Sequence, residues 1–434
     1  MNYALPDSVQ KFALPLLLCL CTVLLSPSLL AQTPRFSNAA DDATRVLDLI
    51  ERRLAVMPEV AAWKWRAQQP IADLEREKQV LDRSVADAEA IGLDGVSARH
   101  FFDVQIRMAR AVQAHAFARW QATGAQPPAG RDLNRELRPA LDAIGRELLV
   151  ALYAASAELP RIIQDDFAVP RFQSLGQYGG IDSSDIAELQ AALTAVHVTK
   201  AATLETIKRV GVLRVGMTGD YSPFSSDRGG VLQGFDVTLA QDLARHWGVT
   251  VRFVRTTWPT LMDDFSKHRF DLAMSGITVT PDRAAHAVFS TAYHIDGKTP
   301  IARCEDAGKL STLEQIDKPS MRVIVNPGGT NERFVRERIK QATIVVHADN
   351  RTVFEELLAG RADVMITDSI EVALQVRRHP KLCGTMRVPL TQAQKGIMMP
   401  QATDLAAEVN EWLAPRLKNG EMRERLELAM NTAQ

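Results

Sequence analysis

The residues from Asn326 to Glu332 join a glycine-containing turn to a carboxylate. The run from Met321 to Val325 predicts a buried strand, and helical spacing resumes from Arg333 to Ile339. Glycines between a strand and a helix let backbone N–H groups approach an anionic ligand. We therefore predict a ligand site that carries its own acid, Glu332. The alternative is that Glu332 only complements the dipole of its helix.

Polar side chains also interrupt apolar stripes in the first part of the chain. Arg53, Lys64 and Gln113 each occupy a position where helical spacing predicts an apolar residue. Arg53 and Lys64 are 11 residues apart, so both point the same way unless Pro58 kinks the helix between them. Each alone is explained by a snorkelling cation or a core amide. Together they indicate an anionic ligand that supplies the missing negative charge.

The hydrophobic periodicity changes near residue 200. Apolar residues recur at helical spacing from Asp41 to about Val198, whereas short apolar runs alternate with helical segments from Leu213 onward. Asp182 to Ser184 predict a cap for a last helix over Ile186 to Val196. We expect a multidomain chain, with an all-α domain followed by an α/β domain that contains parallel sheets.

The N-terminus resembles a secretory leader. Lys11 precedes an apolar run from Phe12 to Leu30, and Ala31 is the expected last leader residue. Residues 1–31 therefore predict a periplasmic or secreted protein with no membrane contact after cleavage. Leu29 stands two positions before Ala31, where a leader is expected to have a small residue, so an uncleaved membrane anchor is the alternative.

Composition and cysteine usage narrow the function further. The chain has 434 residues and a formal net charge of -1, which gives no nucleic-acid signature. The nine histidines are scattered and show no metal-ligand spacing with cysteine, so we expect no metal site. Cys19 and Cys21 would leave with the leader, whereas Cys304 and Cys383 predict a disulfide in an oxidising compartment. Two buried free thiols are the alternative.

A specific set of residues, most of them polar, lies within about residues 38–150. Its members are Arg53, Lys64, Asp73, Arg76 and Glu77, then Gln105-Ile106 with Gln113, and finally Asp132-Leu133 with Arg138-Pro139. In type and spacing these residues resemble the exported subclass of the all-helical chorismate mutases. Glu77 is counted among the substrate-binding residues on that basis. Ala109 departs from the pattern, because relatives often have a small hydroxyl or amide residue there.

The resemblance implies how this domain treats its substrate. Arg53, Arg76 and Arg138 would hold the two carboxylates of chorismate. Lys64 and Gln113 would donate hydrogen bonds to the ether oxygen. The rearrangement of chorismate to prephenate is intramolecular and needs no nucleophile, base or cofactor, so fixed cations and an amide are sufficient.

The second half, about residues 205–434, begins with the strand Leu213 to Gly216 and continues through Gly234-Phe235-Asp236 at a helix start. It resembles the periplasmic amino-acid-binding proteins of type II, whose two α/β lobes close over a ligand. The expected boundaries are 1–31 for the leader, 32–200 for the helical domain with its linker helix, about 205–300 with 395–434 for the first lobe, and about 301–394 for the second.

The same resemblance implies a set of ligand contacts. They are Arg283 for a carboxylate, Tyr221 and Trp258 for a ring or side chain, Ser275, Thr278 and Thr330 for hydrogen bonds, and Asp368 for an amino group. Each has an ordinary structural alternative. Arg283 can be a helix-terminal cation, Trp258 a core residue, and Asp368 the N-cap of a helix that starts at Ser369.

One branch of that fold is catalytic. Thr256 to Pro259, Asp296 to Pro300, Asn326 to Glu332 and Thr367-Asp368 look like cyclohexadienyl dehydratase, and paired Cys304 and Cys383 agree with it. Glu332 would be the general acid that protonates the departing ring hydroxyl of prephenate. Lys298 and Arg283 would share its two carboxylates. Desolvation has to keep the proton on Glu332, since a helix start and nearby cations favour the ionised form.

The two halves together predict a bifunctional exported enzyme that takes chorismate through prephenate to phenylpyruvate without a cofactor. Arogenate stays open as a second substrate, because Asp368 could meet its amino group. A homo-oligomer also stays open. The alternative is a periplasmic amino-acid receptor with a degenerate helical domain, and Glu332 is the residue that distinguishes the two. A sensor module ranks last, because no membrane-spanning or signalling segment follows residue 205.

Overall fold

The computed structural model describes residues 33–162, 166–401 and 404–433; the expected leader over residues 1–31 lies outside them. Within the described ranges, each helix is either too short or too polar to cross a membrane.

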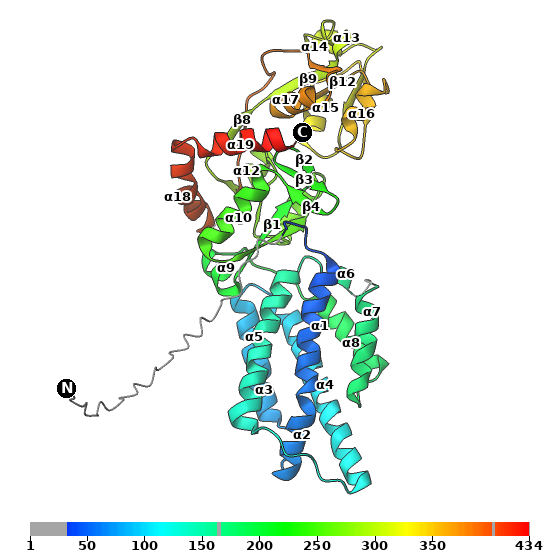
Figure 1. Ribbon diagram of the computed structural model, residues 1–434, viewed down its shortest axis with the longest axis vertical. Helices are drawn as coiled ribbons and strands as arrows, with labels where there is room; N and C mark the ends of the chain where they lie inside the picture. The colour runs from blue at the N-terminus through cyan, green and yellow to red at the C-terminus, as the bar shows by residue number, and fades with distance from the viewer. Residues whose placement is uncertain (1–32, 163–165, 402–403, 434) are drawn as a thin grey trace, which may run out of the picture. The chain divides into compact units, whose positions relative to one another are not determined.

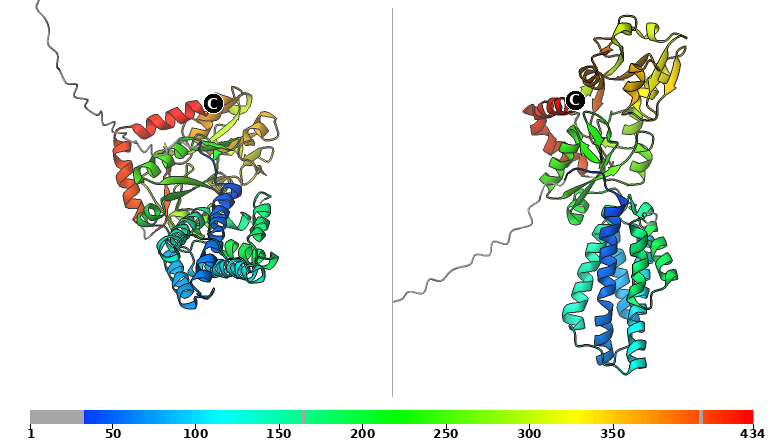
Figure 2. Two further views of the ribbon diagram at one scale, coloured as in Figure 1. Left: turned by 60° about the horizontal axis from the view of Figure 1, so that its bottom comes forward. Right: turned by 45° about the vertical axis from the view of Figure 1, so that its right-hand side comes forward.

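The first domain is a helical bundle in which α1, α3, α4 and α5 lie side by side (Figures 1 and 2). Its elements are α1 (Ala39–Ala55), α2 (Met57–Arg66), α3 (Leu74–Ala90), α4 (Gly95–Thr123), the π-helical turn η1 (Leu133–Leu137), α5 (Arg138–Ala155), α6 (Leu159–Ile162), α7 (Ala168–Ser174), the 3-10 turn η2 (Leu175–Tyr178) and α8 (Ser183–Ala195). Its core includes Leu47, Ile50, Phe101 and Leu148, all fully buried. The all-α prediction for this part is confirmed.

The segment that carries Arg53 and Lys64 is two helices rather than one. Helix α1 ends at Ala55, and α2 begins at Met57. Pro58 lies in the first turn of α2, where its missing N–H has no intrahelical partner to lose. The proline therefore starts a new helix instead of kinking a continuous one.

The second domain contains two five-stranded sheets in which parallel and antiparallel pairs are mixed. Its first elements are α9 (Leu204–Val210), β1 (Val212–Met217), β2 (Asp220–Tyr221), β3 (Ser225–Arg228), β4 (Val231–Gln233), α10 (Phe235–Trp247), β5 (Thr250–Arg255), α11 (Leu261–Ser266), β6 (Leu272–Ala273), α12 (Pro281–Ala284), β7 (Val288–Phe289) and β8 (His294–Asp296). The first sheet has the order β5-β1-β6-β15-β7, in which β1 runs parallel to β5 and β6.

The second sheet has the order β11-β10-β12-β9-β13. The remaining elements are β9 (Lys298–Arg303), α13 (Cys304–Ala307), α14 (Leu313–Ile316), β10 (Arg322–Val325), α15 (Thr330–Arg338), β11 (Thr343–Val346), α16 (Val353–Leu358), β12 (Val364–Asp368), α17 (Ser369–Arg378), β13 (Leu382–Gly384), β14 (Ala393–Lys395), β15 (Met398–Met399), α18 (Leu405–Lys418) and α19 (Glu421–Thr432). The chain returns to the first sheet through β15, which pairs with β6 and β7. The two-lobed α/β prediction is confirmed.

Strand β9 positions a functional lysine. We placed residues up to 300 in the first lobe, but β9 already pairs with β12 of the second sheet. The pairing is antiparallel and sets Lys298 directly opposite Asp368. Directly opposed residues of a strand pair lie within reach of each other's side chains, so the register brings this lysine to the carboxylate.

A disulfide joins Cys304 to Cys383 across 79 residues of the second lobe. We expect the double variant Cys304→Ser, Cys383→Ser to lose up to about 4 kcal/mol of unfolding free energy, because the open chain gains loop entropy when it unfolds. Guanidinium titration measures the change. The wild type in excess reductant should unfold at the same concentration as the variant. Identical midpoints for the variant and the oxidised wild type would show that the bond does not stabilise the fold.

Candidate functional site

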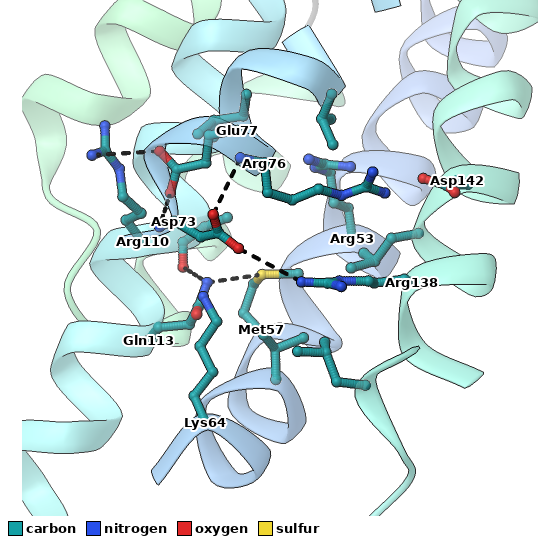
Figure 3. A pocket seen from close by; sticks show the side chains of 16 residues that line it. Arg53, Met57, Lys64, Asp73, Arg76, Glu77, Arg110, Gln113, Arg138 and Asp142 are labelled. Carbon is teal, nitrogen blue, oxygen red and sulfur yellow. Dashed lines mark hydrogen bonds and ion pairs between the residues drawn. The ribbon is translucent and has the colours of Figure 1, made fainter. Parts of the chain in front are cut away.

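A cavity inside the helical bundle gathers the cations predicted from the sequence. It is lined by Arg53, Met57, Val60, Lys64, Asp73, Arg76, Glu77, Val80, Ile106, Ala109, Arg110, Gln113, Leu133, Arg138, Leu141 and Asp142. Its volume is about 740 Å³, open solvent at its mouth included, which lies within the usual range of ligand pockets. Figure 3 shows the polar side chains converging on it from α1, α2, α3, α4 and α5.

The charges around this cavity do not balance. Among the described lining residues, five are cations and three are carboxylates, which leaves an excess of two positive charges. The cations are Arg53, Lys64, Arg76, Arg110 and Arg138, and the carboxylates are Asp73, Glu77 and Asp142. The carboxylates make only long ion pairs here, 3.7 Å from Arg138 to Asp73 and from Arg110 to Glu77. A dianionic ligand would neutralise the excess.

Two of these cations are held in partly desolvated positions. Burial lowers the pKa of Arg53, against an opposing effect of Asp142, and its Nε is buried without a hydrogen-bond partner. Burial also lowers the pKa of Lys64, while the carboxylates of Glu77 and Asp73 oppose the shift. The Lys64 ammonium donates to the carbonyl of Ile71 at 2.5 Å, and two of its three hydrogens are left for a ligand.

Gln113 lies in the cavity wall with its amide partly occupied. Its Nε2 donates to the carbonyl of Ala109 at 3.0 Å and lies 3.6 Å from Met57 Sδ, while its Oε1 is buried and unpartnered. The second amide hydrogen is donated to the Met57 sulfur, a weak acceptor that a substrate oxygen can replace. Our sequence reasoning missed Arg110 and Asp142. Arg110 lies three residues before Gln113, and Asp142 lies four residues after Arg138. These spacings put each on the same helix face as a predicted residue, and that is the signal that could have found them.

A second cavity lies between the two α/β lobes and measures about 330 Å³, open solvent included. The described residues that line it are Tyr221, Trp258, Gly276, Thr278, Arg283, Asn326, Gly329, Thr330, Asn331, Asn350, Asp368, Glu371 and Lys395. The glycine turn before α15 forms one wall, as the spacing of strand, turn and helix predicts. Gly328 has a φ of +77°, and a Cβ there would come within 2.6 Å of the Pro259 backbone, so this turn requires glycine.

Asp368 is fully engaged by protein groups. Its carboxylate accepts from Lys298 at 2.7 Å, from Lys395, and from the Tyr221 hydroxyl at 2.5 Å. Burial alone raises the pKa of Asp368, but the ammonium groups of Lys298 and Lys395 outweigh it and hold the pKa well below its ordinary value. We expected Asp368 to receive a ligand amino group. Asp368 lines the cavity but is paired with two lysines there, and the expected contact stays a prediction.

The same network also includes Lys298, whose expected contact with a substrate carboxylate stays a prediction. Its ammonium donates to Thr330 at 2.8 Å, to Asn331 and to Asp368, which uses all three of its hydrogens. The described lining of the cavity leaves Lys298 out. Lys298 therefore orders the cavity wall and has no hydrogen left for a substrate carboxylate. The lysine that sequence reasoning missed, Lys395, lines the cavity and donates to Thr278 at 2.9 Å.

Most of the other expected contacts do line the cavity. Tyr221, Trp258, Thr278, Arg283 and Thr330 are all present. Arg283 donates to the Thr278 carbonyl at 2.9 Å, and burial lowers its pKa to about 10, with the charge of Arg333 acting in the same direction. Its guanidinium keeps further N–H groups for a carboxylate.

Ser275 departs from the expected set. It was predicted to donate a hydrogen bond to the ligand, but it is absent from the described residues around the cavity. Its buried hydroxyl instead bonds to the Thr218 backbone at 3.1 Å and to the Ser225 hydroxyl at 2.6 Å. Ser275 therefore stabilises the loop that follows β1, and its expected contact with a ligand stays a prediction.

Glu332 is paired with protein groups outside the described lining of the cavity. The described residues around the cavity do not include it. Its carboxylate accepts from the Gly328 N–H at 2.7 Å and from Arg336 at 2.8 Å. These two contacts, the backbone bond first, hold its pKa below the ordinary value although partial burial opposes them. These contacts fit the alternative, a first-turn carboxylate that complements the helix, and the assignment of Glu332 as the acid stays a prediction.

The proton-bearing carboxyl of this cavity is that of Glu371, which sequence reasoning missed. Glu371 is buried and lines the cavity. Burial raises its pKa to about 8, and the negative charge of Asp368 adds to the shift, against a hydrogen bond from Thr367. Glu332 and Glu371 are each the third residue of a helix. The distinguishing sequence signal is the residue four positions later, Arg336 in one helix and the uncharged Gln375 in the other.

Neither cavity offers a metal site. In the described part of the chain, we find no group of three or more His, Cys, Asp or Glu arranged to hold a metal ion.

Comparisons with known proteins match each half separately. A family model described as bacterial extracellular solute-binding proteins, family 3, matches residues 213–428, and one described as chorismate mutase type II matches residues 42–114. Cyclohexadienyl dehydratase of Pseudomonas aeruginosa is 47% identical over 227 residues, which cover 52% of this chain and 84% of that protein. The L-cystine-binding protein TcyJ of Escherichia coli is 26% identical over 237 residues, covering 54% and 88%. A crystal structure of an ancestral cyclohexadienyl dehydratase shares 46% identity over 54% of this chain and 98% of that one, with a TM-score of 0.34. The resemblances inferred from the residues are confirmed.

The raised pKa of Glu371 predicts a pH-dependent stability. Between the ordinary glutamate pKa of about 4.3 and about 8, the folded chain holds a proton that the unfolded chain lacks, so rising pH removes stability at up to about 1.4 kcal/mol per unit. Glu371→Gln removes this titration. In thermal unfolding scans, its stability relative to wild type should rise from pH 5 to pH 8 and then level off.

Glu332→Gln is the matched control, because a lowered pKa has the opposite sign. Ionised Glu332 stabilises the fold above its unfolded pKa, and that contribution is lost only as pH falls. Its variant should therefore show no change relative to wild type between pH 6 and pH 8. Parallel curves for all three proteins across this range would contradict the protonation assigned to Glu371.

Proposed function

We propose that this chain converts chorismate to phenylpyruvate in two steps. The chain belongs to the family 3 bacterial extracellular solute-binding proteins and carries a type II chorismate mutase domain before that fold. The helical domain rearranges chorismate to prephenate. The two-lobed domain then removes water and carbon dioxide from prephenate. Arogenate is a further substrate to be tested in the second step.

In the first step, the bundle cavity acts by charge and by shape. Arg53, Arg76 and Arg138 hold the two carboxylates, which matches the two-charge excess of the lining. The ether bond breaks as a carbon–carbon bond forms in the same molecule, and negative charge develops on the ether oxygen. Lys64 and Gln113 can each donate a hydrogen to that oxygen. Preorganised donors in a partly desolvated cavity lower the barrier without any proton transfer.

In the second step, Glu371 supplies the proton. The departing ring hydroxyl takes that proton and leaves as water, while the ring carboxylate leaves as carbon dioxide and its bonding pair completes the aromatic ring. Solvent then returns a proton to Glu371. Arg283 and the N-terminus of α15, at Gly329 and Thr330, are the groups that face the cavity for the two carboxylates. Closure of the lobes keeps Glu371 desolvated and therefore protonated.

One observation carries the proposal over the receptor alternative: a buried carboxyl with a pKa of about 8 lines the ligand cavity. An amino-acid receptor uses a carboxylate to hold the ligand ammonium, but Asp368 is occupied by Lys298 and Lys395. A neutral acid in a cation-rich cavity serves proton donation to a dianion. We also propose that the mature chain is exported, which agrees with the extracellular description of its family.

The test of the whole function is to incubate the purified mature chain with chorismate and follow prephenate and phenylpyruvate. Wild type should form phenylpyruvate. Lys64→Ala should lower the kcat of the first step by at least about 100-fold, by analogy with loss of an oxyanion donor, and leave dehydration of added prephenate unchanged. Arg66→Ala, an exposed cation of the same helix, is the control. Normal chorismate turnover by Lys64→Ala would refute the assignment of this cavity.

The two glutamates separate the competing acids of the second step. Glu371→Gln should abolish prephenate turnover while the variant still binds prephenate and still converts chorismate to prephenate. Glu332→Gln should keep dehydratase kcat within about twofold of wild type, because Glu332 lies outside the cavity. Wild-type kcat/KM should fall as pH rises through about 8, where Glu371 of the free enzyme loses its proton. The opposite pattern in the two variants would restore Glu332 as the acid.

A further inference from the structure

A chain of hydrogen bonds runs behind Glu371 through three elements of the second lobe. Lys298, at the start of β9, donates to the side-chain oxygen of Asn331 in α15. Asn331 Nδ2 donates to Thr367 Oγ1 of β12 at 3.0 Å. Thr367 Oγ1 in turn donates to Oε2 of Glu371 in α17. Thr367 is fully buried, so its hydroxyl depends on these two partners.

The direction of this chain follows from its first member. A lysine ammonium has only donor hydrogens, so it selects the oxygen end of the Asn331 amide and turns the NH₂ end toward Thr367. The threonine hydroxyl has one hydrogen, and with Asn331 donating to its oxygen that hydrogen points to Glu371. Oε2 of Glu371 is therefore an acceptor. The proton of the neutral carboxyl is left to Oε1.

We propose that Thr367 is a positioning residue for dehydration, which with Asn331 and Lys298 behind it fixes the proton of Glu371 on Oε1. The inference rests on the proposed function, in which Glu371 is the acid. Thr367 does not touch the substrate in this scheme, since the described cavity lining leaves it out. Its hydroxyl acts through Glu371 in two ways: it holds the carboxyl in one orientation, and it stabilises the ionised form left after proton transfer.

Thr367→Val tests this role, because valine keeps the shape of threonine and lacks the hydroxyl. We expect kcat for prephenate to fall by about tenfold or more, as a misoriented acid loses part of the effect of general acid catalysis. Loss of the hydrogen bond to the ionised carboxylate should move the alkaline limb of kcat upward by about one pH unit. KM should change by less than about twofold, because binding groups are untouched. Thr367→Ser should restore both kcat and the limb.

Thr256→Val is the matched control. Thr256 is also a buried threonine whose hydroxyl donates to a carboxylate, that of Asp264 at 2.7 Å, but neither residue is among the described lining of the cavity. Its variant should lose stability and leave the alkaline limb in place. Mutase activity of each variant reports that the chain is folded. If Thr367→Val does not fold, Thr367→Ala, which leaves a void and no clash, replaces it.

The outcomes separate this inference from the function on which it rests. If Glu371→Gln is inactive but Thr367→Val keeps the wild-type kcat and alkaline limb, the positioning role is wrong and the dehydratase assignment stands. If kcat falls equally in Thr367→Val and Thr367→Ser and the alkaline limb does not move, the positioning role is also wrong. That result would indicate an effect of packing alone. If Glu371→Gln turns over prephenate normally, the acid itself is wrong.

Discussion

The ionised carboxylate of Asp368 determines the charge state of the cavity between the lobes. A buried carboxylate is costly unless it is paired, and Lys298 and Lys395 supply that pairing. With one negative charge fixed in a desolvated place, a second one three residues later, on Glu371, is disfavoured by repulsion as well as by burial. The pairing also uses the hydrogens of Lys298, which leaves Arg283 and the start of α15 as the groups proposed to meet a ligand carboxylate. The proton on Glu371 and the choice of ligand-binding groups therefore have one physical origin.

The bundle cavity also relies on cations, but the rearrangement proposed for it needs no proton transfer. Its cations are partly exposed and imperfectly paired, and the long contacts of Arg138 and Arg110 leave them free to face a ligand. A rearrangement that needs no proton transfer can be served by fixed cations and amide donors alone. The cavity between the lobes needs a neutral acid among cations, which requires deeper burial. Depth of burial, more than residue type, separates the two chemistries.

This difference explains how far sequence reasoning could go. The bundle residues were predictable because Arg53, Lys64 and Gln113 each interrupt an apolar stripe of a helix, although the break between α1 and α2 was not foreseen. The α/β fold followed from its alternating strands and helices. The proposed acid, Glu371, was not predictable in that way, because Glu332 and Glu371 occupy equivalent positions of α15 and α17. What separates them is tertiary: Arg336 neutralises one, and the packing of β12 and α17 buries the other beside Asp368.

The fates of Asp368, Lys298 and Ser275 depended on tertiary contacts in the same sense. Each is a residue type that can touch a ligand, and each is hydrogen-bonded to a protein group that lies far away in the sequence. The pairing of β9 with β12 brings Lys298 to Asp368, and the loop after β1 brings Thr218 to Ser275. Spacing predicts which side chains share a face, but the partners that satisfy them come from packing.

The balance of cations and carboxylates in the two cavities also affects product release. With Glu371 neutral, the cations that line this cavity or lie directly behind its wall, Arg283, Lys395 and Lys298, exceed the one carboxylate of Asp368 by two. Chorismate and prephenate each carry two carboxylates, so the bundle cavity binds its product with the same charge complement as its substrate. Phenylpyruvate carries only one, because the other leaves as carbon dioxide. The cavity between the lobes therefore loses electrostatic complementarity to its ligand as the reaction completes, and the next prephenate is the better-matched occupant.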